Sequence, residues 1–267
     1  MHASPVSTAT CVRRLFVLLC GYEIIPLSVS LRGADDRLVI AVPITAYLLD
    51  TDRGWVLFDT GLDEANLRDP ARRASHYTAI GWDPAPVVKP HHELGAQLAG
   101  LGLGFDDIST VILSHLHADH TGHLKRLTHA RVLIQKAEQA CIAQDPLPMA
   151  VFASDIRLDG LRWDILDGDA EIMPGITALF TPGHTPGHMS LRVDLPVTGP
   201  VILTADVGDL AENFDAGILP GASVDDDAAL ASIRRINALE AETGALKLMT
   251  HDPDQARRIR LAPECYD

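Results

Sequence analysis

A segment of six residues holds four side chains that could bind metal ions. It reads His-Leu-His-Ala-Asp-His and runs from His115 to His120. The apolar run 111–113 precedes it and predicts a buried strand. Alternate residues of a strand share a face, so His115 and His117 can point at one ion, while Asp119 and His120, after a turn, can point at a second. Imidazole and carboxylate groups suit zinc and its first-row neighbours, so the segment predicts a two-metal site.

Further candidate ligands follow apolar runs later in the chain. The loop 181–188 reads TPGHTPGH and carries His184 and His188, only one of which is needed to complete a three-histidine site. Asp206 and His251 each come directly after a short run that predicts a strand. Because an α/β scaffold can bring several strand ends together, we expect these residues to meet the first cluster.

The elements that must position these residues alternate between strands and helices, which predicts a mixed α/β class. Expected strands cover 14–19, 38–49, 55–58, 111–113, 130–135, 163–166, 176–180, 189–193, 201–204 and 246–250; expected helices cover 92–103, 137–143 and 225–242. The Asp52-Arg53-Gly54 turn predicts a hairpin. Residues 62–90 hold four prolines and no clear periodicity, so they predict a functional lid or a disordered loop.

The amino-acid composition restricts which partners the chain is expected to bind and in which cell compartment it is expected. Lys and Arg number 22 against 36 Asp and Glu, a net charge of −14, which argues against a nucleic-acid partner. No stretch approaches the ~20 apolar residues of a membrane span, so no membrane partner is expected. Four scattered cysteines predict free thiols in a reducing cytoplasm. We expect a single domain over 1–267, with 1–12 as a flexible tail.

Together these motifs resemble the metallo-β-lactamase superfamily. The resemblance rests on HLHADH, on TPGHTPGH, on Asp206 and His251 in that order, and on Asp59-Thr60-Gly61 after the expected strand 55–58. It runs from about residue 14 to residue 260, nearly the whole chain. It implies an αββα sandwich with a two-metal site at one edge.

The resemblance also implies a role for each candidate. Six residues would bind one metal each and a seventh would bridge both: His115, His117 and His188 for the first metal, Asp119, His120 and His251 for the second, and Asp206 as the bridge. His184 is then the histidine that is not a ligand. Asp59 would accept a hydrogen bond from a ligand histidine and fix its tautomer. Two Zn²⁺ ions are the expected cofactors, although Fe, Mn and Co accept the same ligand types.

Such a site suits hydrolysis of an ester-like bond. Two ions ~3.5–4 Å apart can hold a hydroxide at neutral pH, and Asp119 could carry its proton to the leaving oxygen. Within the superfamily the chain most resembles the N-acyl homoserine lactonases, for example over 44–49 and 212–214. We therefore expect a lactone-opening, quorum-quenching hydrolase, with a homodimer as its assembly.

Other functions remain open on the same residues. The substrate could be another lactone such as 4-pyridoxolactone, or the same metal site could serve a thioesterase or phosphodiesterase. A non-catalytic metal-binding protein would keep the ligands and show no turnover.

One position departs from the lactonase pattern. Many of these lactonases have a tyrosine three residues after the bridging aspartate, where this chain has Asp209. A carboxylate cannot donate a hydrogen bond unless protonated, and it would repel a developing oxyanion. Tyr22, Tyr77 and Trp82 are the candidate replacements near the substrate, although Tyr77 and Trp82 can equally pack 62–90 on the core. Asp209 itself is a fourth candidate near the substrate, and the alternative is that it simply points to solvent.

Overall fold

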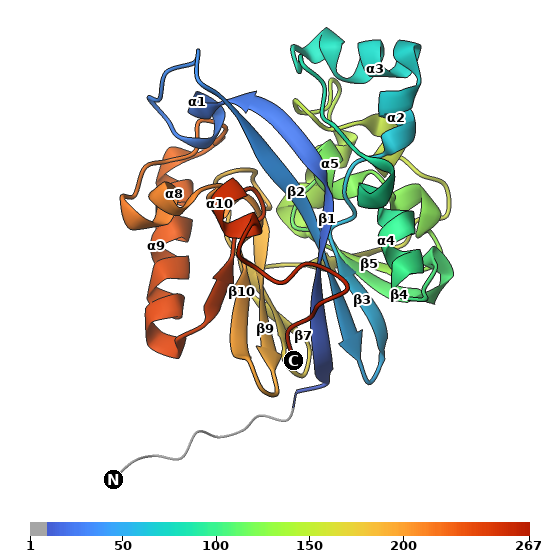
Figure 1. Cartoon of the computed structure of the whole chain (residues 1–267), viewed down its shortest axis with the longest axis vertical. Helices are drawn as coiled ribbons and strands as arrows, with labels where there is room; N and C mark the ends of the chain where they lie inside the picture. Colours follow the sequence, from blue (N-terminus) through green and yellow to red (C-terminus); the bar gives the residue numbers. More distant parts are fainter. Residues whose placement is uncertain (1–9) are drawn as a thin grey trace.

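The computed structural model describes residues 10–267, which form two β-sheets that face each other between two layers of helices (Figure 1). The first sheet contains, in spatial order, β1 (Val12–Pro26), β2 (Val39–Thr51), β3 (Gly54–Phe58), β4 (Ile108–Ile112), β5 (Arg131–Gln135) and β6 (Trp163–Leu166). The second contains, in spatial order, β11 (Leu246–Leu248), β10 (Gly199–Leu203), β9 (Met189–Leu195), β8 (Ile176–Phe180) and β7 (Ala170–Met173).

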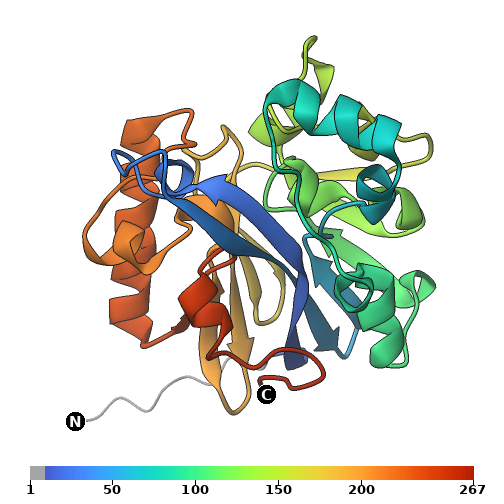
Figure 2. The same ribbon diagram turned by 45° about the horizontal axis from the view of Figure 1, so that its top comes forward.

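The alternation of apolar residues along β1 explains the layers. Leu15 and Val17 belong to the core between the two sheets, whereas Phe16 and Leu18 belong to the core under the helices. This is the two-residue period of a strand that is buried on both faces. β1 and β2 form a long antiparallel hairpin, which lies between the two helical sides in Figure 2. Strands β3 to β6 are parallel, so their carboxyl ends share one edge.

Helices cover the outer faces of both sheets. On the side of the second sheet lie α8 (Ala211–Asp215) and α9 (Asp226–Thr243), and on the other side lie α2 (Glu64–Arg68), α3 (Pro70–His76) and α4 (Leu94–Gly100) (Figure 1). The shorter helices are α1 (Leu27–Ser30), α5 (Ala118–Thr121), α6 (Lys136–Gln139), α7 (Ala153–Ile156) and α10 (Pro253–Ala256). The side chain of Asp225 caps the start of α9, and Gly244, with φ 67°, follows its last residue.

The αββα expectation is confirmed, with three corrections. Residues 62–90 are not a disordered loop, because α2 and α3 form there; the lid alternative for this stretch stays a prediction. Strand β7 was not predicted. The expected tail 1–12 is wrong at its end, since Cys11 and Val12 are buried and β1 begins at Val12; positions 1–9 lie outside the described residues.

All four cysteines are free. Within 10–267 no helix is both long and apolar enough to cross a membrane.

Candidate metal centre

The candidate ligands gather where strands of both sheets end. His115 follows β4, His184 follows β8, Asp206 follows β10 and His251 follows β11. In two groups every residue offers a ligand atom, and these atoms lie within 4.8 Å of one another: His115, His117, His184 and Asp206, and then Asp119, His120, Asp206 and His251. Asp206 belongs to both groups, so its carboxylate lies between them.

The two oxygens of Asp206 face different histidines. Its Oδ2 lies 3.3 Å from Nε2 of His184 and 3.3 Å from Nε2 of His251, and its Oδ1 lies 3.4 Å from Nε2 of His120. His115 Nε2 and Asp206 Oδ1 are buried without a hydrogen-bond partner in the described part of the chain. Unpaired buried donors and acceptors are costly, and a metal ion would satisfy these atoms. The donor set therefore fits a divalent metal pair.

His184 takes the place that the sequence analysis gave to His188. His184 Nε2 lies 3.0 Å from Nδ1 of His117, within the first group. His188 points elsewhere, because its Nδ1 donates to the backbone carbonyl of Thr181 at 2.9 Å and its Nε2 accepts from the backbone N–H of Asp206 at 3.0 Å. Both ring nitrogens are already used, so placing His188 among the metal ligands was wrong.

Hydrogen bonds fix the orientation of the remaining histidines. Nδ1 of His120 donates to Oδ2 of Asp59 at 2.8 Å, the contact that the sequence analysis assigned to Asp59. The other carboxylate oxygen accepts from the backbone N–H of Ser114 at 2.7 Å. Nδ1 of His251 donates to the carbonyl of Pro43 at 2.7 Å. Each of these bonds leaves Nε2 as the free nitrogen, which is how partners behind a ligand set its tautomer.

The two ligand groups differ in the direction in which the pKa values of their histidines are shifted. Burial lowers the pKa of His115, His117 and His184, in His184 to about 3, so these imidazoles are neutral and can offer a lone pair.

The second group carries the opposite balance. Burial also lowers the pKa of His120, but the carboxylates of Asp119 and Asp206 outweigh burial and raise the pKa well above its usual range. Burial is likewise outweighed at His251, whose pKa is raised by Asp206. The carboxylates of this group therefore demand cationic neighbours, which protons or metal ions can supply.

Backbone strain is concentrated at the same place. Three residues other than glycine have positive φ in the described chain: Asp59 at 60°, Ala150 at 60° and Ala205 at 47°. Asp59 orients His120, Ala205 precedes Asp206, and Ala150 lines the adjoining cavity. Such conformations cost about 1–3 kcal/mol each and persist where the surrounding structure enforces them.

A cavity of about 670 Å³ opens onto both ligand groups. Of the four residues proposed near the substrate, Trp82 and Asp209 line it. Tyr22 and Tyr77 do not, so their expected place at the substrate is wrong. Tyr77 is fully buried against Trp82, with ring centroids 5.2 Å apart, and Tyr22 packs edge to face with His92, with ring centroids 5.6 Å apart. Only the packing alternative holds for Tyr77.

Two buried acidic side chains, Asp209 and Glu23, make part of this cavity wall polar. Asp209 does not point to solvent, since it is buried and burial raises its pKa to about 6. Glu23, which the sequence analysis did not single out, is also buried, and burial raises its pKa well above its usual range. Its signal was available, because Glu23 is the one charged residue between Leu15 and Pro26 of β1 and it lies at a buried position.

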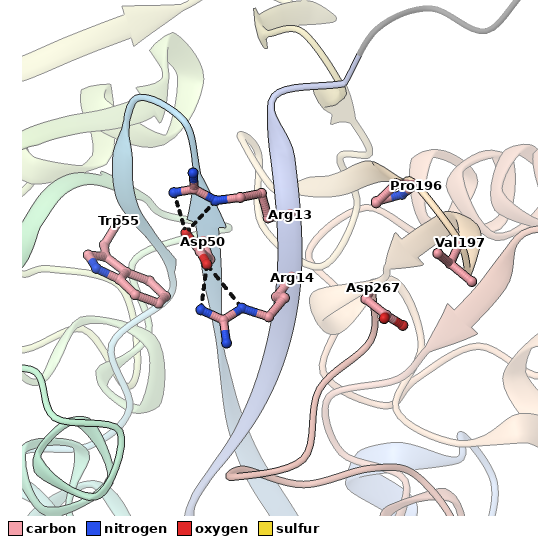
Figure 3. Close-up of a pocket in the computed structure, with 7 residues that line it drawn as sticks. All are labelled: Arg13, Arg14, Asp50, Trp55, Pro196, Val197 and Asp267. Atoms are coloured by element: carbon pink, nitrogen blue, oxygen red, sulfur yellow. Dashed lines mark hydrogen bonds and ion pairs between the residues drawn. The ribbon is translucent and has the colours of Figure 1, made fainter.

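A second hollow, of about 790 Å³, lies away from the metal centre (Figure 3). It is lined by Arg13, Arg14, Asp50, Trp55, Pro196, Val197 and Asp267. Both guanidinium groups are bound to the carboxylate of Asp50, Arg13 at 2.8 Å and Arg14 at 2.6 Å. Because Asp50 uses both cations, this hollow offers little free charge to a ligand.

A family model described as the metallo-beta-lactamase superfamily matches residues 39–244, which contain every member of the two ligand groups except His251. The chain belongs to the metallo-β-lactamase superfamily. The family that its motifs resemble is thereby confirmed.

Individual superfamily members resemble the chain over most of its length. The N-acyl homoserine lactonase AiiA of Bacillus thuringiensis subsp. kurstaki is 30% identical over 226 residues, which cover 85% of this chain and 88% of AiiA. The N-acyl homoserine lactonase AttM of Azorhizobium caulinodans is 30% identical over 234 residues, with the same two coverages. A solved N-acyl homoserine lactone hydrolase, with N-hexanoyl-L-homoserine bound at its catalytic metal centre, superposes with a TM-score of 0.84 at 28% identity, covering 97% of this chain and all of the other.

Proposed function

We propose that this protein is a metal-dependent hydrolase that opens the lactone ring of N-acyl homoserine lactones. The observation that carries the proposal is the pair of ligand groups joined by Asp206 at the wall of a large cavity. The relatives named as N-acyl homoserine lactonases, and the related structure with a ring-opened product at its metals, support this substrate class.

The ligand groups suit two divalent ions, and zinc is the ion we propose. His115, His117 and His184 would hold one ion, Asp119, His120 and His251 the other, and Asp206 would contact both. When bound, such ions polarise a substrate carbonyl and make water nucleophilic near neutral pH.

Asp119 is the residue best placed to move a proton. Its carboxylate lines the cavity, and Oδ2 lies 2.9 Å from Nε2 of His120. Burial raises its pKa, but His120 outweighs burial and holds the pKa below its usual range. Asp119 is therefore ionised at neutral pH, so it can accept a proton from the attacking water and deliver it to the leaving ring oxygen.

The cavity suits a ligand with an apolar extension. Its wall includes Val42, Trp82 and Val151, and the exposed side chains of Met149 and Val224 also line it. An acyl chain could cover these groups and remove them from water. The carboxylate of Asp209 in the same wall, which is ionised above its pKa of about 6, would repel an anionic phosphodiester, which favours the lactone over that alternative.

The remaining expectations are kept as proposals. A single domain is supported by the core that the two sheets share. A cytoplasmic location is supported by the four free cysteines. The net charge of −14 supports the proposed lack of a nucleic-acid partner, and a homodimer is proposed from the family resemblance alone.

A proton-release assay on zinc-loaded protein tests the function, since opening a lactone liberates a carboxylic acid. N-hexanoyl and N-decanoyl homoserine lactone would be compared, with chelator-treated protein as the control. We expect turnover that chelation abolishes and zinc restores. Protein that holds two zinc ions but leaves both lactones intact would contradict the proposal and direct the search to thioesters and aromatic lactones.

A further inference from the structure

Glu138 lies behind the metal centre and belongs to neither ligand group. It is 2% exposed, on the short helix α6 that follows β5. Its carboxylate accepts three hydrogen bonds. Oε1 accepts from the backbone N–H of Leu116 at 3.1 Å, and Oε2 accepts from Oγ1 of Thr185 at 2.7 Å and from the backbone N–H of Gly187 at 2.9 Å.

These donors come from both loops that carry the first ligand group. Leu116 lies between His115 and His117, and Thr185 directly follows His184. The two loops are about seventy residues apart in sequence, and no strand pairing joins β4 to β8 because they belong to different sheets. One buried carboxylate thus ties together the backbones on either side of the pair His117 and His184, whose facing nitrogens are 3.0 Å apart.

The packing around this contact leaves no room for adjustment. A Cβ added to Gly187 would lie 2.1 Å from the backbone nitrogen of Glu138. The second glycine of the TPGHTPGH loop therefore allows the loop to approach α6 closely enough for the hydrogen bond. All three partners are donors, so an ionised carboxylate satisfies them without a proton of its own, and such charge-assisted bonds are stronger than neutral ones.

We propose that Glu138 is a positioning residue that holds the His117 loop and the His184 loop at the separation that the first metal position requires. This inference rests on the proposed metal centre. The second position is not tied in this way, because His120 is oriented by Asp59 and His251 by Pro43. Loss of the Glu138 carboxylate should therefore weaken one metal position and leave the other nearly unchanged.

A metal titration against a competing chelator tests the inference directly. Zinc and cobalt would be titrated into the metal-free wild type and into Glu138→Gln, with His184→Ala and His251→Ala showing which binding step belongs to which group. Glutamine keeps one acceptor oxygen but puts an N–H₂ group opposite an N–H or O–H donor. We expect the first-position affinity to fall about 10–100-fold, as for other partners of ligand residues, with the second step unchanged.

Two further variants keep the test decisive. Thr185→Val removes one of the three donors with little change in shape, so it should weaken the same step by less, even if Glu138→Gln fails to fold. Glu171→Gln, at an exposed carboxylate, is the matched control and should leave both steps intact. Unchanged affinities in Glu138→Gln and Thr185→Val, or equal weakening of both steps, would overturn the inference alone. A wild type that binds no metal would overturn the proposed function as well.

Discussion

Nε2 of His188 accepts a hydrogen bond from the backbone N–H of Asp206 at 3.0 Å. The opposite ring nitrogen donates to the carbonyl of Thr181, so the imidazole spans the ends of β8 and β10. His188 thereby holds the backbone of the residue that lies between the two ligand groups, whereas His184 offers its Nε2 to that residue's carboxylate at 3.3 Å. The two histidines of one loop thus perform different tasks.

Replacement of each histidine should separate these tasks. His184→Ala should lose one of two bound metals, because it removes a nitrogen from the first group. His188→Ala should keep two metals at saturating zinc but lower the free energy of unfolding by about 1–3 kcal/mol, because the buried Asp206 N–H loses its acceptor. Metal content after gel filtration and urea unfolding of the metal-free variants would measure both effects. Metal loss in His188→Ala together with full occupancy in His184→Ala would reverse the assignment.

Asp59→Asn should weaken metal binding without removing a ligand. The carboxylate accepts from Nδ1 of His120 and from the backbone of Ser114, and an amide can place only one acceptor oxygen between them. We expect the affinity of the second metal position to fall about 10–100-fold. Chelator competition would measure it, with the exposed Asp36→Asn as the control. An unaltered affinity would show that Asp59 does not orient His120.

Most of the ligand set could be predicted because His115, Asp206 and His251 each follow a recognisable strand. His115, His117, Asp119 and His120 also lie within six residues, so the local backbone suffices to group them. The choice between His184 and His188 depends instead on how the loop turns. Gly183 has φ 134°, and an added Cβ there would lie 2.2 Å from the backbone of α9. Contact with a distant helix shapes this loop, and spacing alone does not reveal it.

Glu138 and α3 were also missed in the sequence, for two different reasons. Glu138 lies between Lys136 and Gln139, and such polar neighbours are typical of a turn that faces solvent. It is buried because two loops that are distant in sequence pack on it. By contrast, α3 carried a readable start signal. The side chain of Asp69 accepts from two backbone N–H groups of the first turn, and Pro70 follows it. Because this stretch lacks apolar periodicity, α3 was not predicted, although Asp69 and Pro70 at its start indicated a helix.

Asp209→Asn should raise lactonase activity if lactones are the substrates. The ionised carboxylate lines the cavity beside the ligand groups and would repel a developing oxyanion, whereas an amide can donate a hydrogen bond to it. Since burial places the pKa of Asp209 at about 6, the contrast should be largest near pH 8. We expect kcat/KM for N-hexanoyl homoserine lactone to rise about 10-fold, which is less than the roughly 100- to 1000-fold that one such donor contributes where it is fully aligned. The exposed Asp215→Asn is the control, and a fall in kcat/KM would show that this acid assists the reaction.

A buried carboxyl outside the two ligand groups should make stability depend on pH. Burial raises the pKa of Asp155 to about 7, and its Oδ2 has no hydrogen-bond partner in the described chain. Between about pH 4 and pH 7 the unfolded chain has lost this proton while the folded chain retains it. Stability therefore falls as pH rises through this range and the loss is complete above pH 7.

Asp155→Asn should remove that dependence. At about 1.4 kcal/mol per pKa unit, the roughly three-unit shift corresponds to at most about 4 kcal/mol, so the variant should exceed the wild type by a few kcal/mol at pH 8 and match it at pH 4. Urea unfolding of the metal-free proteins at pH 4, 6 and 8 would measure the difference in unfolding free energy between the variant and the wild type. Effects of pH that are common to both proteins cancel in this difference. The exposed Asp159→Asn should show no such trend. A variant that is less stable than the wild type at pH 8 would mean that the ionised carboxylate is stabilised by Lys125, whose charge opposes the shift.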